Sequence, residues 1–113
     1  MCSEPVTESG SPPTFSQMIY HLVEKSVWES TQHQPTIATP GPDGFVHCCD
    51  ERQLASVRDA NFATDVPVVA LAVDPTRLAF ETRYEAGSGG ELARFPHVHG
   101  PIETSTVIEV IEI

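Results

Sequence analysis

Histidines set in apolar, strand-like segments are the feature of this 113-residue sequence with the clearest chemical potential. His21 lies in the run MIYHLV, His47 lies in GFVHC, and His97 and His99 lie in FPHVHGP. A buried imidazole costs free energy unless it is hydrogen-bonded, bound to a ligand or used in catalysis. We therefore predict one polar pocket lined by buried, neutral histidines from several strands. Neutral buried histidines also predict that stability is lost as the pH falls below about 6.5.

The spacing of His97 and His99 suggests a metal site. On a strand, residues two apart project from the same face, roughly 6–7 Å from each other. His47 or His21 could add a third ligand from another strand, which would suit zinc. The alternative is that both histidines are satisfied by hydrogen bonds near a loop, and the spacing alone leaves both interpretations open.

Tyr84 and Glu85 end a predicted strand just before the glycine-rich segment 86–92. A carboxylate there could act as an acid, a base or an acceptor for a ribose hydroxyl. The alternative is an ordinary exposed glutamate. The glycine segment matches no phosphate-binding pattern, so we interpret it as a lid or a hairpin connection.

The surrounding elements predict a single α+β domain. Residues 1–17 are rich in Ser, Pro, Thr and Glu and are predicted to be a disordered tail, so the domain covers 18–113. Asp50 and Gln53 have the spacing of a capping box, which marks a helix start. We predict about six strands, which form a mixed, split or curved sheet, and two helices. The strands are predicted at 19–23, 44–48, 66–73, 79–84, 95–98 and 106–113, and the helices at 26–31 and from 50 to about 63–65.

Composition narrows the classes of partner and the compartment. The formal net charge is −10, from 16 acidic and 6 basic residues, which disfavours nucleic acid and anionic membranes. No apolar stretch approaches the roughly 18 residues that a membrane-spanning helix needs. Three cysteines without framework spacing favour a reduced, cytoplasmic compartment. The sequence leaves the oligomeric state open.

Several motifs in this order resemble a family of small bacterial proteins. They are IYH at 19–21, Trp28 in the next helix, GFxHC at 44–48, YE at 84–85 and FPHxxGP at 95–101. The combination resembles the domain-of-unknown-function family numbered nine-five-two, from Met18 to Ile113. The resemblance implies an ADP-ribosylation-like fold, similar to that of the ADP-ribosyltransferases, in which a split sheet holds NAD in a cleft.

The same resemblance implies roles for individual residues. His21 matches a first-strand histidine that contacts the ribose of NAD, and His47 matches a second histidine of the pocket. Tyr84 joins them as a residue of the cofactor site. His97 of the FPH motif would orient or polarise the substrate, and Glu85 is the candidate catalytic carboxylate.

Two positions depart from the family pattern. Cys49 stands where members usually carry Ser, and His99 stands where they usually carry Tyr. The pair of histidines at 97 and 99, and with it the metal hypothesis, is therefore particular to this chain.

Three functions follow from these observations. The first is binding of NAD or another small nucleotide, with transfer of an ADP-ribosyl or glycosyl group as the associated enzymatic activity. The second is a metal site built on His47, His97 and His99. The third is a non-catalytic ligand-binding or interaction module.

Overall fold

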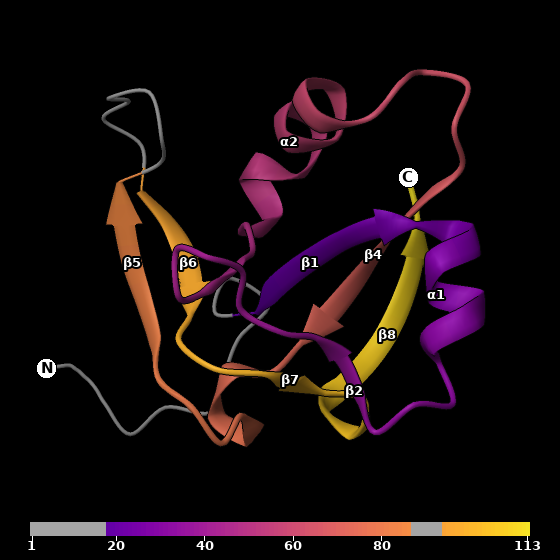
Figure 1. Ribbon diagram of the computed structural model, residues 1–113. Helices are drawn as coiled ribbons and strands as arrows, with labels where there is room; N and C mark the ends of the chain where they lie inside the picture. Colours follow the sequence, from indigo (N-terminus) through magenta and orange to yellow (C-terminus); the bar gives the residue numbers. More distant parts are fainter. Residues whose placement is uncertain (1–17, 87–93) are drawn as a thin grey trace, which may run out of the picture.

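The computed structural model describes residues 18–86 and 94–113. Eight strands form three separate sheets, accompanied by two α-helices and short 3₁₀ turns (Figure 1). Every strand pairing is antiparallel. The α+β class and the split sheet are therefore confirmed, whereas a mixed sheet is wrong because no described pair runs parallel. The glycine-rich segment lies almost entirely outside the described residues, as does the tail.

The first sheet has the order β1–β4–β8 and provides most of the apolar core. It consists of β1 (Ile19–Glu24), β4 (Val68–Val73) and β8 (Val107–Glu112). All six residues of β4 are buried, because this valine-rich strand lies between two partners and is covered on both faces. The register between β4 and β8 shifts beside Ala72, which leaves Ile108 without a partner at a β-bulge.

The second three-stranded sheet has the order β3–β6–β5. It consists of β3 (Val46–His47), β6 (Arg94–Val98) and β5 (Thr82–Ala86). In Figure 1, β5 and β6 lie on the opposite side of the molecule from β8 and α1. The sequence placed β5 three residues too early, at 79–84, because a 3₁₀ turn and a bend precede it.

A two-stranded sheet pairs β2 (Thr36–Ala38) with β7 (Ile102–Glu103). The prolines and glycine of residues 32–43 are typical of a loop, so the sequence pattern does not reveal β2. The strand forms because Ile37 is buried in the core and β7 supplies its backbone partner. Two-residue strands such as β7 carry too short a pattern to be seen in the sequence.

Two α-helices complete the fold. α1 (Lys25–Thr31) packs against β1, β2 and β4, and α2 (Leu54–Asn61) ends two or more residues earlier than predicted. The predicted capping box precedes α2, at a 3₁₀ turn: the Gln53 N–H donates to Asp50 Oδ1 at 3.0 Å, and the Asp50 N–H donates to Gln53 Oε1 at 2.9 Å. The Asp50 carboxylate therefore already fills the anion-binding position at the start of this helical segment.

Backbone hydrogen bonds join the two three-stranded sheets. The Tyr20 N–H donates to the Cys49 carbonyl at 2.8 Å, and the Cys49 N–H donates to the Tyr20 carbonyl at 2.9 Å. The side chains of β4 alternate between two apolar clusters, with Leu71 on one face and Ala70 and Ala72 on the other. Small side chains on the second face leave room beside α2. No helix among the described residues combines the length and apolar character needed to cross a membrane.

Candidate functional site

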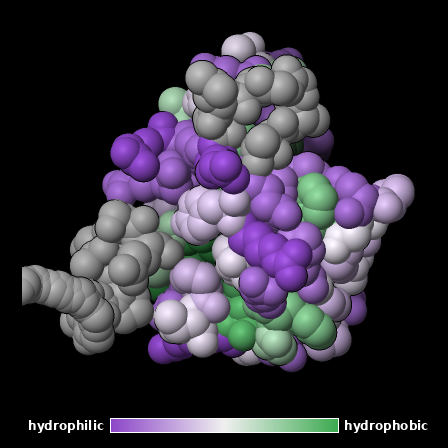
Figure 2. Space-filling model, turned by 90° about the vertical axis from the view of Figure 1, so that its left-hand side faces the viewer, coloured by the Kyte–Doolittle hydropathy of each residue, from purple (hydrophilic) through white to green (hydrophobic). Residues whose placement is uncertain are grey.

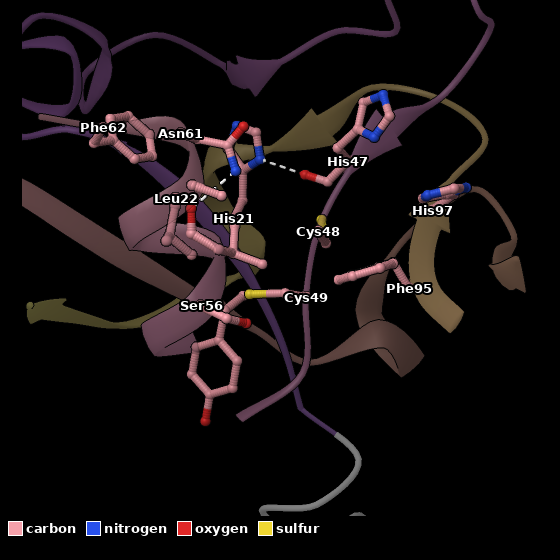
Figure 3. Close-up of a pocket in the computed structure, with 13 residues that line it drawn as sticks. His21, Leu22, His47, Cys48, Cys49, Ser56, Asn61, Phe62, Phe95 and His97 are labelled. Atoms are coloured by element: carbon pink, nitrogen blue, oxygen red, sulfur yellow. Dashed lines mark hydrogen bonds between the residues drawn. The ribbon is translucent and has the colours of Figure 1, made fainter. Parts of the chain in front are cut away.

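A cavity of about 670 Å³ lies between the two three-stranded sheets and α2 (Figure 3). We call it the histidine cleft. Its lining comes from β1, from β3 and the two cysteines after it, from α2 and its C-terminal end, and from β6. The polar side chains of the lining are Tyr20, His21, His47, Ser56, Asn61 and His97. Of the predicted pocket histidines, His21, His47 and His97 line this cavity.

His21 projects from β1, and its Nδ1 lies 3.0 Å from the carbonyl oxygen of His47 (Figure 3). A carbonyl oxygen can only accept, so the imidazole carries its proton on Nδ1 and its Nε2 is an acceptor. Burial lowers the pKa of His21 below the usual 6.5, and this effect exceeds the opposing effect of the hydrogen bond to His47. His21 is therefore neutral at pH 7, as the sequence predicted.

His97 on β6 is buried, with 3% of its surface exposed. Its Nδ1 lies 2.9 Å from Glu85 Oε1, and the same oxygen accepts from His99 Nε2 at 3.0 Å. These two hydrogen bonds, that from His97 first, hold the pKa of Glu85 below its usual value, so the carboxylate is ionised. The arrangement places the proton of a neutral His97 on Nδ1 and leaves Nε2 as an acceptor. His97 and His99 share one face, as their spacing predicted.

The ring of Phe45 fixes these imidazoles from the other side. It stacks on His97 with centroids 4.0 Å apart and an interplanar angle of 14°. His47 and His99 also contact it, with centroids at 4.8 Å and 5.5 Å. Because stacking and the Glu85 hydrogen bond act together, His97 is held in one orientation.

His47 occupies a different environment from the other two imidazoles of the cleft. Its side chain is 62% exposed, and its Nε2 pairs with Asp43 Oδ2 at 2.8 Å. The prediction that His47 is buried is therefore wrong. The cause is the short β3 strand, which ends at His47 and presents this side chain on the outer face, whereas Val46 faces the core. His47 lies at the exposed rim of the histidine cleft.

Three predicted site residues do not line the histidine cleft: Tyr84, Glu85 and His99. Tyr84 and Glu85 belong to β5, which is separated from β3 by β6 in the sheet. Tyr84 is about half exposed. The structure brings Glu85 and His99 to His97 instead, so Glu85 acts on the cleft through the imidazole that it orients.

Sequence reasoning missed several functional positions. Phe45 lies inside the GFxHC motif, but its stacking on His97 depends on the β3–β6 pairing, which a single sequence does not reveal. Asn61 and Phe62, at the C-terminal end of α2, line the cleft rather than filling the core. Phe95 lines it beside the FPH motif. The signal in the sequence that could have identified these positions is the presence of aromatic residues beside a motif histidine.

Among residues 18–86 and 94–113, no group of three or more His, Cys, Asp or Glu side chains could hold a metal ion. One ring nitrogen of each of these histidines is paired with a carboxylate, His97 and His99 with Glu85 and His47 with Asp43. The geometry thus gives the zinc hypothesis no support within the described part of the chain.

Cys48 and Cys49 are both buried and reduced. Burial raises the pKa of the Cys48 thiol, with a smaller contribution from Cys49. Burial and the nearby Asp50 raise the pKa of Cys49 to about 12. Because the thiolate is the nucleophilic form, neither sulfur is poised for nucleophilic chemistry at neutral pH.

The face of the molecule on the β5 side is mainly hydrophilic, with a smaller hydrophobic area recessed between hydrophilic side chains (Figure 2). The fold and the site geometry together define a small antiparallel α+β domain with a histidine-lined cleft between two sheets.

Residues 22–110 match the family described as "Protein of unknown function (DUF952)". The chain belongs to this family, as the motifs predicted.

Solved structures of one protein are similar to this chain. The X-ray crystal structure of protein CC0527 from Caulobacter crescentus shares 27% identity with a TM-score of 0.69, and the match covers 84% of each chain. The solution NMR structure of CC0527 shares 28% identity with a TM-score of 0.68, over 83% of this chain and 82% of that one. No curated protein matches the chain.

Proposed function

We propose that the domain binds a nucleoside-containing small molecule of the NAD or ADP-ribose kind in the histidine cleft. The observation that carries the proposal is that His21, Asn61 and His97 all line one cavity that is also lined by aromatic rings. Ligand sites of this kind combine apolar walls with a few polar groups that fix the orientation of the ligand.

The size of the cavity agrees with this class of ligand. A volume of about 670 Å³ lies within the range of roughly 300–1,000 Å³ that is usual for small-molecule and cofactor sites. Phe62 and Phe95 supply flat apolar surfaces for a nucleobase or a nicotinamide ring.

The test is a proton–nitrogen NMR titration with NAD, ADP-ribose and zinc in parallel. We expect saturable shifts with NAD or ADP-ribose at residues of the histidine cleft, above all at His21, Asn61 and Phe95. His21→Ala should weaken binding, whereas His33→Ala should not, because His33 is exposed and outside the cleft. Absence of shifts with both nucleotides would refute the proposal, and shifts with zinc alone would favour the metal site.

A second candidate function is cleavage of the nicotinamide glycosidic bond, which the Glu85–His97 pair favours. A carboxylate that orients an imidazole is the usual arrangement for a general base. Water would attack C1′ of the ribose, and nicotinamide would leave with the electron pair of the broken C–N bond. His97 Nε2 would take the proton of the attacking water, and Glu85 would act as a positioning residue.

Release of nicotinamide from NAD tests this second function. We expect slow release by the wild-type protein, an unchanged rate for His33→Ala, and a decrease of roughly a hundredfold for His97→Ala. Glu85→Gln should also change the pH profile of the rate, because it alters the group that orients the imidazole. Binding of NAD without any release would leave a binding domain and exclude this activity.

A further inference from the structure

Among the residues that the structure describes, the lining of the histidine cleft contains no Lys, Arg, Asp or Glu side chain. A phosphate or pyrophosphate is usually held by Lys, Arg or a free helix N-terminus. The helical segment that contributes to this cleft begins with its anion position filled by the Asp50 carboxylate. Nothing in the lining therefore compensates the negative charge of a phosphate.

His21 and His97 of the cleft have the same tautomer. His21 donates from Nδ1 to a backbone carbonyl, and His97 donates from Nδ1 to the Glu85 carboxylate. Both partners can only accept, so each ring, when it carries a single proton, presents Nε2 as a hydrogen-bond acceptor. A phosphate group also consists of acceptors and cannot pair with them.

Neither Nε2 has a hydrogen-bond partner among residues 18–86 and 94–113. Both residues line the cleft. A ring nitrogen of this kind can accept a hydrogen bond from a ligand bound there.

We infer that the histidine cleft binds the phosphate-free part of its ligand, through hydroxyl or N–H groups that donate hydrogen bonds to His21 Nε2 and His97 Nε2. The ligand class is thus a nucleoside with free ribose hydroxyls, and any phosphates of a nucleotide extend into solvent. This inference rests on the proposed function, because it specifies which part of such a ligand the cleft recognises.

The test compares ligands rather than relying on variants alone, since replacing the buried His97 could unfold the domain. Adenosine and nicotinamide riboside are titrated by NMR or calorimetry beside ADP-ribose, NAD and inorganic pyrophosphate, at a pH of about 8, where ordinary imidazoles are neutral. We expect at least one nucleoside to bind within about threefold of its nucleotide, and pyrophosphate not to bind. The 2′,3′-dideoxy nucleoside should bind roughly tenfold more weakly, because two donors are lost.

Protein variants give an independent readout. His21→Ala should weaken nucleoside binding by roughly tenfold, and His33→Ala should have no effect. A nucleotide that binds tenfold or more tightly than its nucleoside would overturn the inference and leave the proposed function standing. Equal binding of the nucleoside and its dideoxy form would also overturn the inference. Absence of binding by every nucleoside and nucleotide would overturn both.

Discussion

The two three-stranded sheets differ in what they bury. In β1–β4–β8, the central strand buries six consecutive apolar residues. In β3–β6–β5, the central strand buries Pro96, His97 and Val98, and its imidazole is satisfied by a carboxylate from the neighbouring strand. The first sheet therefore supplies hydrophobic stability, whereas the second sheet holds an oriented polar group in part of its interior. From this contrast we infer that the chemistry of the domain is located in the sheet whose interior is less apolar.

The largest expected effect is on the apolar sheet. Leu71→Ala in β4 removes a side chain that is only 1% exposed, and we expect a loss of about 2–5 kcal/mol in the free energy of unfolding. Urea denaturation measures it. Ile108→Ala is the matched control, since Ile108 is half exposed at the bulge and should cost far less. Equal losses for the two variants would contradict the assignment of the core to β4.

Gly100→Ala is expected to have the next largest effect, near the polar sheet. A Cβ at Gly100 would overlap the Cβ and the ring of Phe80, so the Phe80 side chain would have to move. We expect a loss of about 1–3 kcal/mol, as for overpacking in general. Gly41→Ala is the control, because its Cβ would make only an ordinary contact with Asp43. A neutral Gly100→Ala would show that Phe80 does not pack there.

The two sheets should also respond to acid at different pH values. Burial lowers the pKa of His21, so the stability tied to its neutral form is complete above pH 6.5 and is lost as the pH falls below that value. Hydrogen bonds from His97 and His99 lower the pKa of Glu85, so its contribution is complete above pH 4.5 and is lost as the pH falls further. Urea midpoints measured across this range should show both steps.

Two variants separate these steps. His21→Gln should remove the upper step, and Glu85→Gln should remove the lower one. A midpoint that does not change between about pH 8 and pH 5.5 in the wild-type protein would contradict the buried, neutral state of His21.

The smallest effect is expected for the ion pair between Lys25 and Glu112, whose charged atoms lie 3.0 Å apart on the exposed side of the first sheet. Water screens exposed pairs, so Lys25→Ala should barely change the urea midpoint, and added salt should abolish the difference. A change as large as that of Gly100→Ala would show that the pair is structural.

The sequence predicted the parts that depend on local pattern. The valine run identified β4, the Asp50–Gln53 spacing identified the capping box, and the His97–His99 spacing identified a shared face. It did not predict that Glu85 would pair with His97, because this contact depends on the register of the β5–β6 pairing, which the sequence pattern does not give. Glu85 was expected at a ribose hydroxyl, and the structure places it behind the imidazole instead.

The measurement that tests the central claim most directly is nitrogen-15 NMR of the histidine side chains at a pH of about 8. The account predicts that His21 and His97 both carry the proton on Nδ1, with an unprotonated Nε2 that shifts when a nucleoside is added. A proton on Nε2 in either ring would contradict the claim that the histidine cleft presents two acceptors to its ligand.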